Sequence, residues 1–180
     1  QLNQLKKVFI QAFPNLTISY GDTPSCSLTK DLSGADEIRP GNFVYYDCIQ
    51  CEIGSCTIDE IAVAVACPVV AIHSKRNELV IYGGAVHLSK ECLTDSNGIK
   101  KYGLIVHILN NGWSDPIQGA YVRSISQEHG IMEHSGKLSR EMNIGEMLLF
   151  LPAHSCMTAN LMREYHSLEG SRISTMNSME

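Results

Sequence analysis

Short apolar runs separated by turn-forming residues fill most of this 180-residue chain from residue 42 onward. The runs are "FVYYDCI", "EIAVAVACPVVAIH", "LVIYGGAV", "YGLIVHIL", "GAYVRSIS" and "MLLFLPAH", and the turn signals between them include "SKRN", "DSNG", "NNG" and "HSGK". Runs of this length, rich in β-branched and aromatic residues and bounded by Gly, Asn and Ser, are typical of strands. So many short strands at close spacing predict a β-barrel or β-sandwich.

The first 25 residues have a different pattern. Apolar residues recur at helical spacing from Leu2 to Phe13 and Pro14 follows them, so a helix is expected over residues 2–13. "LTISYG" then reads as a short strand, and a helix next to a strand is typical of an α/β layer. We therefore expect an α/β segment at 1–25 and a β domain at 26–168, with a short helix at 157–165 and a flexible polar tail at 169–180.

Composition excludes several classes of partner. The net charge is −5 with scattered Lys and Arg, which disfavours nucleic acid, and no apolar run approaches the ~20 residues of a membrane helix. No signal peptide is visible, and seven cysteines, an odd number, indicate reduced thiols in the cytoplasm rather than a disulfide framework. The chain opens at Gln1 on an uncapped helix, so we expect it to be part of a longer protein.

His154 and Cys156 stand two positions apart in "LPAHSC", at the end of an apolar run. On an extended strand such residues point to the same side, so an imidazole and a thiolate could reach one ion, and both are good zinc ligands. The spacing alone is a weak signal, because this pattern is common by chance. The alternative is a packed cysteine beside a histidine bonded to backbone.

Two further motifs contain acidic, imidazole or thiol groups. "QEHGI" places Glu128 and His129 beside a glycine, where they could support a metal site or only end a strand; His134 is expected in a solvated loop. "CIQC" has the spacing of zinc knuckles, but on a strand Cys48 and Cys51 would point to opposite faces.

A glycine-led turn, "SYGDTPS", follows the first expected strand. Backbone N–H groups around Gly21 and the Thr23 hydroxyl could hold a phosphate, although such loops are usually only turns. Asp22 counts against phosphate binding unless its side chain points away.

Five motifs in order, "SYGDTPSC", "IRPGNFVYYDCIQ", "IYGGAVHLSKE", "SQEHGI" and "LPAHSCMTANL", resemble the C-terminal portion of D-serine dehydratase and D-threonine aldolase-like enzymes. These belong to the alanine racemase-type fold III of pyridoxal phosphate enzymes, and the resemblance covers roughly residues 17–165. It implies a mainly β fold: the C-terminal β domain, preceded by a short remnant of a TIM-type barrel whose other part carries the Schiff-base lysine. No lysine of this chain receives that role.

The resemblance also implies site residues. His154 and Cys156 match the zinc pair of the family, and Gly21 and Thr23 match its cofactor-phosphate loop, where Asp22 departs from the usual small or hydroxyl residue. Glu128, His129 and Gln50 match positions around the site, as do Tyr46 and Asp47, without an assigned step. Because dehydratase members resemble this chain in having Cys at the second ligand, whereas aldolase members have Asp, Cys156 favours dehydration.

The resemblance therefore implies a lyase that uses pyridoxal phosphate and zinc on D-3-hydroxy amino acids, converting D-serine to pyruvate and ammonia. It also implies a homodimer, and the isolated segment is expected to be inactive. Alternatives that remain open are an aldolase, a racemase of the same fold, and, in a different class, a stand-alone β-barrel binding module in which the histidine and cysteines are structural.

Overall fold

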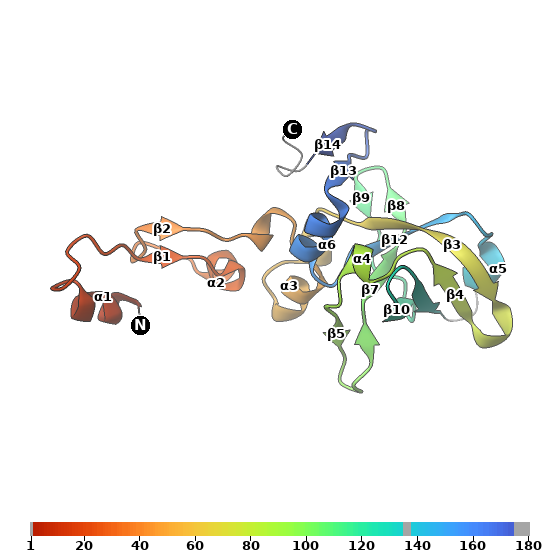
Figure 1. Ribbon diagram of the computed structural model, residues 1–180, viewed down its shortest axis with the longest axis horizontal. Coiled ribbons are helices and arrows are strands. Elements are labelled where there is room, and N and C mark those ends of the chain that lie inside the picture. The colour runs from red at the N-terminus through yellow and green to blue at the C-terminus, as the bar shows by residue number, and fades with distance from the viewer. Residues whose placement is uncertain (1, 135–137, 175–180) are drawn as a thin grey trace.

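The centre of the molecule is a closed barrel of six antiparallel strands (Figure 1). The computed structural model describes residues 2–134 and 138–174. The strands follow the order β10–β11–β4–β3–β12–β7 around the barrel. Their bounds are β3 (Val65–His73), β4 (Glu78–Ile81), β7 (Gly103–Val106), β10 (Tyr121–Ile125), β11 (Gly130–Glu133) and β12 (Met147–Pro152). The prediction of a mainly β barrel is confirmed.

Strand β12 is covered on both faces because alternate side chains enter two different apolar clusters. Phe150 lies in the larger cluster, which fills the barrel, and pairs in register with Val65 and Ile105. The next residue, Leu151, lies in a second cluster outside the barrel with Cys48, Ile61, Leu93 and Val106. The end of β12 is therefore held firmly from two sides, and that end carries His154.

Helices flank the barrel in the segments between strands. The α-helices there are α3 (Cys48–Ile53), α4 (Ala85–Leu88), α5 (Leu138–Glu141) and α6 (Ser155–Met162), and the short 3₁₀ helices are η1 (Asn42–Val44), η2 (Ile58–Glu60) and η3 (Ser74–Arg76). The helix expected at 157–165 is present as α6, which begins two residues earlier and ends at Met162; residues 164 and 165 of the expected helix lie in a strand instead.

The expected strand at "FVYYDCI" is wrong, because these residues form η1 and the start of α3. Asp47 accepts a hydrogen bond from the Gln50 amide at 2.8 Å and so caps the helix at its N-terminus. Gly54, at φ 87°, ends it in the left-handed conformation that favours glycine. The two capping residues override the strand preference of the aromatic run before them.

The N-terminal elements extend away from the barrel (Figure 1). They are α1 (Leu2–Phe9), β1 (Ser19–Tyr20), α2 (Thr23–Leu28) and β2 (Glu37–Ile38). The helix α1 is shorter than the expected 2–13 and buries none of its residues. Strands β1 and β2 pair in parallel, as strands of an α/β layer do. That this segment derives from a TIM-type barrel stays a prediction.

Two-stranded ribbons complete the described chain: β5 (Leu93–Thr94) with β6 (Lys100–Lys101), β8 (Ile108–Leu109) with β9 (Gly112–Trp113), and β13 (Glu164–His166) with β14 (Arg172–Ser174). Strand β14 lies inside the expected tail 169–180, whose residues 175–180 lie outside the described part of the chain, as do residues 135–137 of the "HSGK" turn. In the described ranges, no helix has the length and apolar character needed to cross a membrane.

Candidate functional site

A groove of about 820 Å³ lies where α4, the end of β10 and α6 meet. Val86 and Lys90 line it from α4 and the residues after it, Gln127 from the turn after β10, and Cys156 and Asn160 from α6. The groove therefore brings together residues from "IYGGAVHLSKE", "SQEHGI" and "LPAHSCMTANL", three motifs that are far apart in the sequence.

His154 and Cys156 lie on either side of the junction between β12 and α6. His154 is the extended N-cap residue of α6, yet its side chain makes no capping hydrogen bond, and Cys156 lies in the first helical turn with a free thiol. The expectation that both residues belong to one extended strand is therefore wrong for Cys156. Burial, and then the nearby carboxylate of Asp47, raise the pKa of the Cys156 thiol.

A buried carboxylate, that of Asp47, accepts a hydrogen bond from this junction. Asp47 is 0% exposed, and its Oδ2 accepts hydrogen bonds from the Ser155 amide at 3.0 Å and from Asn42 Nδ2 at 2.6 Å. The Ser155 hydroxyl donates to Asn42 Oδ1 at 3.0 Å. Asp47 thus caps α3 through Gln50 and also binds the first amide of α6, which lies 108 residues further along the chain.

Two glycines fix the position of α4 and of the wall of the groove formed by the turn after β10. A Cβ at Gly84 would lie 2.6 Å from backbone atoms of Gln127, Glu128 and His129, so only glycine fits there without a shift. A Cβ at Gly130 would likewise lie 2.6 Å from the Gly83 carbonyl oxygen. Backbone therefore packs directly on backbone at this wall.

Glu128 and His129 are exposed in the turn between β10 and β11. The His129 ring meets the edge of Tyr82, with 5.6 Å between centroids, and Tyr82 also contacts His87 at 5.0 Å. Neither Glu128 nor His129 joins His154 in a metal cluster: among the described residues, no group of three His, Cys, Asp or Glu side chains could hold a metal ion.

The prediction for His134 is wrong, because it is 4% exposed rather than solvated. It directly follows β11, the strand that the sequence analysis missed, and lies next to the barrel. Burial lowers the pKa of its imidazole.

The "CIQC" motif is helical, so Cys48 and Cys51 are one turn apart on the same side of α3 rather than on opposite faces of a strand. Cys48 is buried and donates to the Leu151 carbonyl at 3.6 Å, and burial raises its pKa. Gln50 has a buried Oε1 to which no described residue donates a hydrogen bond. Its backbone amide binds Asp47, so its link to the His154 junction is indirect.

Gly21 lies just before α2 and Thr23 is its first residue; Gly21 is exposed and Thr23 is buried. The Thr23 hydroxyl accepts from the Asn42 amide at 3.2 Å, and Asp22 turns back to cap α2 through the Ser25 amide at 3.0 Å. The side chain of Asp22 is therefore engaged within its own helix. Arg39, which the sequence analysis did not select, brings its guanidinium beside Gly21.

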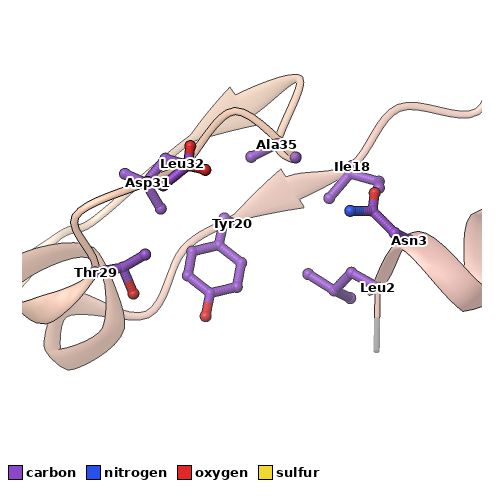
Figure 2. Close-up of a pocket in the computed structure, with 9 residues that line it drawn as sticks. Leu2, Asn3, Ile18, Tyr20, Thr29, Asp31, Leu32 and Ala35 are labelled. Carbon is purple, nitrogen blue, oxygen red and sulfur yellow. The ribbon is translucent and has the colours of Figure 1, made fainter.

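A second hollow of about 400 Å³ lies in the N-terminal segment (Figure 2). Its lining comes from α1, β1 and the loop before β2, with Leu2, Ile18, Tyr20 and Leu32 among the lining residues. None of the predicted site residues lines it.

Asn42, Asp47 and Ser155 are the residues around the junction whose role sequence reasoning missed. Asp47 had a detectable signal, since an Asp followed by a short helical stretch and Gly54 is the pattern of a capped helix. Its contact with α6 had none, because the two partners are 108 residues apart.

The architecture defines a class of protein. The chain resembles an alanine racemase-like protein from Idiomarina loihiensis, with 28% identity, a TM-score of 0.78, and coverage of 94% of this chain and 46% of the other. It also superposes on D-threo-3-hydroxyaspartate dehydratase from Delftia sp. HT23, with a TM-score of 0.80, 23% identity, and coverage of 96% and 47%. The fold is thus the mainly β part of an alanine racemase-like protein.

The family model "Putative serine dehydratase domain" matches residues 62–168, and the chain belongs to this family. The D-serine dehydratase of Dictyostelium discoideum is 34% identical over 158 residues, which are 83% of this chain and 38% of that enzyme. The chain spans about two-fifths of the length of the curated relatives it matches.

A D-threo-3-hydroxyaspartate dehydratase has also been solved as a histidine-to-alanine mutant and as a cysteine-to-alanine mutant in the metal-free form. The two mutated positions of that enzyme are two residues apart, as are His154 and Cys156 here.

Proposed function

We propose that this chain is the metal-binding β domain of a zinc- and pyridoxal phosphate-dependent lyase that acts on D-3-hydroxy amino acids, with dehydration of D-serine as the favoured reaction. The observation that carries the proposal is the pair His154 and Cys156 at a rigid strand-to-helix junction, with Cys156 lining a groove. Membership of the serine dehydratase family supports the same reaction class.

The donor chemistry of the junction suits zinc. Nitrogen and sulfur are ligands that zinc prefers, and catalytic zinc sites leave positions open for water or substrate. The His154 ring has no capping bond to give up, and the Cys156 thiol is free. Two protein ligands are half of a tetrahedral set, so the other positions fall to water, substrate or groups outside the described residues.

The loop at Gly21 suits a phosphate group in part. The Asp22 carboxylate already accepts the Ser25 amide at the start of α2, so its negative charge stays beside the loop and counts against an anion. The Arg39 guanidinium beside Gly21 supplies a positive charge, which it shares with Glu37 at 3.5 Å. The Thr23 hydroxyl already accepts a backbone N–H from Asn42, so it can still donate its own proton to a phosphate oxygen.

Each bound group supplies one part of the chemistry. When bound, zinc would supply Lewis-acid chemistry for the β-hydroxyl, a poor leaving group, and pyridoxal phosphate would supply stabilisation of negative charge at the α-carbon. The residues of this chain would hold and orient these groups: His154 and Cys156 would bind the metal, and Gly21 and Thr23 would contact the cofactor phosphate. Glu128, His129 and Gln50 lie around the site in the proposed arrangement.

Dehydration is favoured over aldol cleavage because the proposed second ligand is Cys156. The resemblance implies Cys at this position in dehydratase members and Asp in aldolase members. We place the enzyme in the cytoplasm, as a homodimer, with a small D-amino acid as its substrate. The lysine that binds the cofactor belongs to sequence outside this chain, so the segment alone should show no turnover.

The deciding experiment measures pyruvate release from D-serine by the longer protein that contains this segment, with and without a chelator. We expect turnover that chelation abolishes and zinc restores, and a loss of activity in His154→Ala and Cys156→Ala. Failure to convert any D-3-hydroxy amino acid in a metal-dependent way would contradict the proposal. Glycine and an aldehyde as products would make the enzyme an aldolase, and inversion at the α-carbon without metal would make it a racemase.

A further inference from the structure

We propose that Asp47 is a positioning residue for the His154–Cys156 pair: it binds the first N–H of α6, at Ser155, and places a buried carboxylate beside the metal position. This inference rests on the proposed metal site and assigns to it a residue that does not itself bind the ion. It is carried by the hydrogen bonds at the junction, by the burial of Asp47 and by the lack of an ion pair to Asp47 among the described residues.

The first residue of α6 is capped in an unusual way. A helix leaves its first N–H groups unsatisfied, and the N-cap side chain normally accepts one of them. Here the N-cap is His154, whose side chain does not do so. The Ser155 amide, the first N–H of α6, donates to Asp47 Oδ2 at 3.0 Å, so a residue from another segment binds the helix N-terminus. The imidazole makes no capping hydrogen bond and is available as a ligand.

The Asp47 carboxylate is also held rigidly. Its Oδ1 accepts from the Gln50 amide at 2.8 Å, so the carboxylate is fixed by α3. Asn42 donates to Asp47 Oδ2 and accepts from the Ser155 hydroxyl, so it bridges the same two residues by its amide group. Two helices and the segment before α3 therefore meet on one carboxylate, and the residue between His154 and Cys156 is held by its backbone and by its side chain.

The charge of Asp47 is buried without a cation. Asp47 is 0% exposed, and Asn42, Gln50 and Ser155 all donate to it, as an ionised carboxylate requires. Among the described residues, none of the Lys, Arg or His side chains forms an ion pair with it. Hydrogen bonds and the N-termini of α3 and α6 offset the cost of burying this carboxylate, and a divalent ion at the adjacent pair would add an attraction that no cationic side chain provides.

The test uses Co²⁺ as the probe on the 180-residue chain, because a thiolate bound to Co²⁺ gives a charge-transfer band in the near ultraviolet. The signal of interest is the part of the band that Cys156→Ala removes, which separates this thiol from the other cysteines. Replacing Asp47 by Asn keeps the shape and removes the charge; we expect a roughly 10- to 100-fold weaker Co²⁺ affinity and a shifted band, as for other residues that orient metal ligands. Asp59→Asn, which removes one negative charge from an exposed position near α3, should change neither.

Circular dichroism and thermal melting of each variant separate loss of fold from loss of affinity. Should Asp47→Asn fail to fold, Asn42→Ala and Ser155→Ala, which leave the carboxylate in place, must each weaken Co²⁺ binding. Unchanged affinity and an unchanged band in the folded variants would overturn the positioning role and leave the proposed lyase intact. Absence of any Cys156-dependent band in the unaltered chain would overturn the metal site and the role of Asp47 together.

Discussion

The barrel and the N-terminal segment, residues 2–38, contain similar apolar side chains but bury them very differently. In the barrel Phe150, Ile105 and Val122 are 0% exposed. In the described part of the N-terminal segment Ile18 is the single buried apolar side chain, while Phe13 is 60% exposed. The barrel has its own core, whereas the N-terminal elements depend on individual polar contacts such as the Asp22 cap of α2 and the ion pair of Lys6 with Asp36.

This difference explains why the candidate metal pair and the candidate phosphate loop are held so differently. His154 follows a strand that two apolar clusters fix on both faces, so its position is determined within the described barrel. Gly21 follows a two-residue strand with a single parallel neighbour in the described chain. The connection between them is polar and passes through Thr23 and Asn42.

The largest expected effect comes from truncating the same residue type in both regions. Phe150→Ala should lower the free energy of unfolding by about 3–5 kcal/mol, because it leaves a cavity in the barrel. Phe13→Ala should change it by less than about 0.5 kcal/mol, because that ring is largely exposed. Urea titration followed by circular dichroism measures both values. Similar losses in the two variants would break the comparison.

A smaller effect is expected from matched glycine substitutions. Gly84→Ala should cost about 1–3 kcal/mol, because its methyl group would meet three backbone atoms at 2.6 Å in the wall of the groove. Gly41, in the segment between the two regions, has nothing within 4 Å of the place where a methyl group would stand, and its φ of −81° is in the right-handed helical region. Gly41→Ala should therefore be neutral or stabilise by up to about 1 kcal/mol.

The same urea titrations test the glycine pair. A loss for Gly41→Ala as large as that for Gly84→Ala would show that the segment before η1 is packed more tightly than its open surroundings indicate. A neutral Gly84→Ala would show that the turn between β10 and β11 can move away from α4.

The smallest expected effect is a difference in the pH at which the barrel region and the N-terminal segment lose stability. Burial lowers the pKa of His87 from 6.5, so the unfolded chain takes up this proton first, and stability around α4 should fall as the pH drops below 6.5 toward the lowered value. The Lys6 ammonium lowers the pKa of Asp36 from 3.8, so its contribution is present above pH 3.8 and is lost only as the pH falls through the lowered value. Amide hydrogen exchange, corrected for intrinsic rates, should show α4 loosening at a higher pH than β1.

His87→Gln provides the control for this pH effect. It should remove the part of the loss at α4 that begins below pH 6.5, while the response of His134, whose pKa is also lowered, remains. Loosening of both regions over one pH range would contradict the assignment.

Apolar runs in the sequence predicted the barrel, and helix-forming residues predicted α6; of the predicted site residues, Cys156 lines the groove. The secondary-structure prediction failed where two capping residues override the strand preference of an apolar run. The aromatic stretch before Asp47 favours a strand, but the cap at Asp47 and the left-handed Gly54 produce a helix. Prediction also failed for His134, because the burial of a polar residue after β11 depends on the closure of the barrel.

Parts of the site depend on contacts between residues that are far apart in the sequence, and these parts could not be predicted. The hydrogen bonds of Asp47 join residues 42, 50 and 155, and no local pattern encodes a bond between an amide and a carboxylate 108 residues apart. The same holds for Gly84, whose need for glycine arises from the approach of the turn at residues 127–129. Both features require the folded barrel before they exist.

The long-range cap of α6 also sets a condition for protein engineering. A designer who transplants the strand, histidine and helix of residues 147–162 onto another scaffold would carry the two candidate ligands but leave behind the carboxylate that receives the Ser155 amide. In the new host water or another side chain would have to accept that amide, or the helix would fray at its first turn. The smallest portable unit is therefore discontinuous, and it includes residues 42–50 together with 147–162.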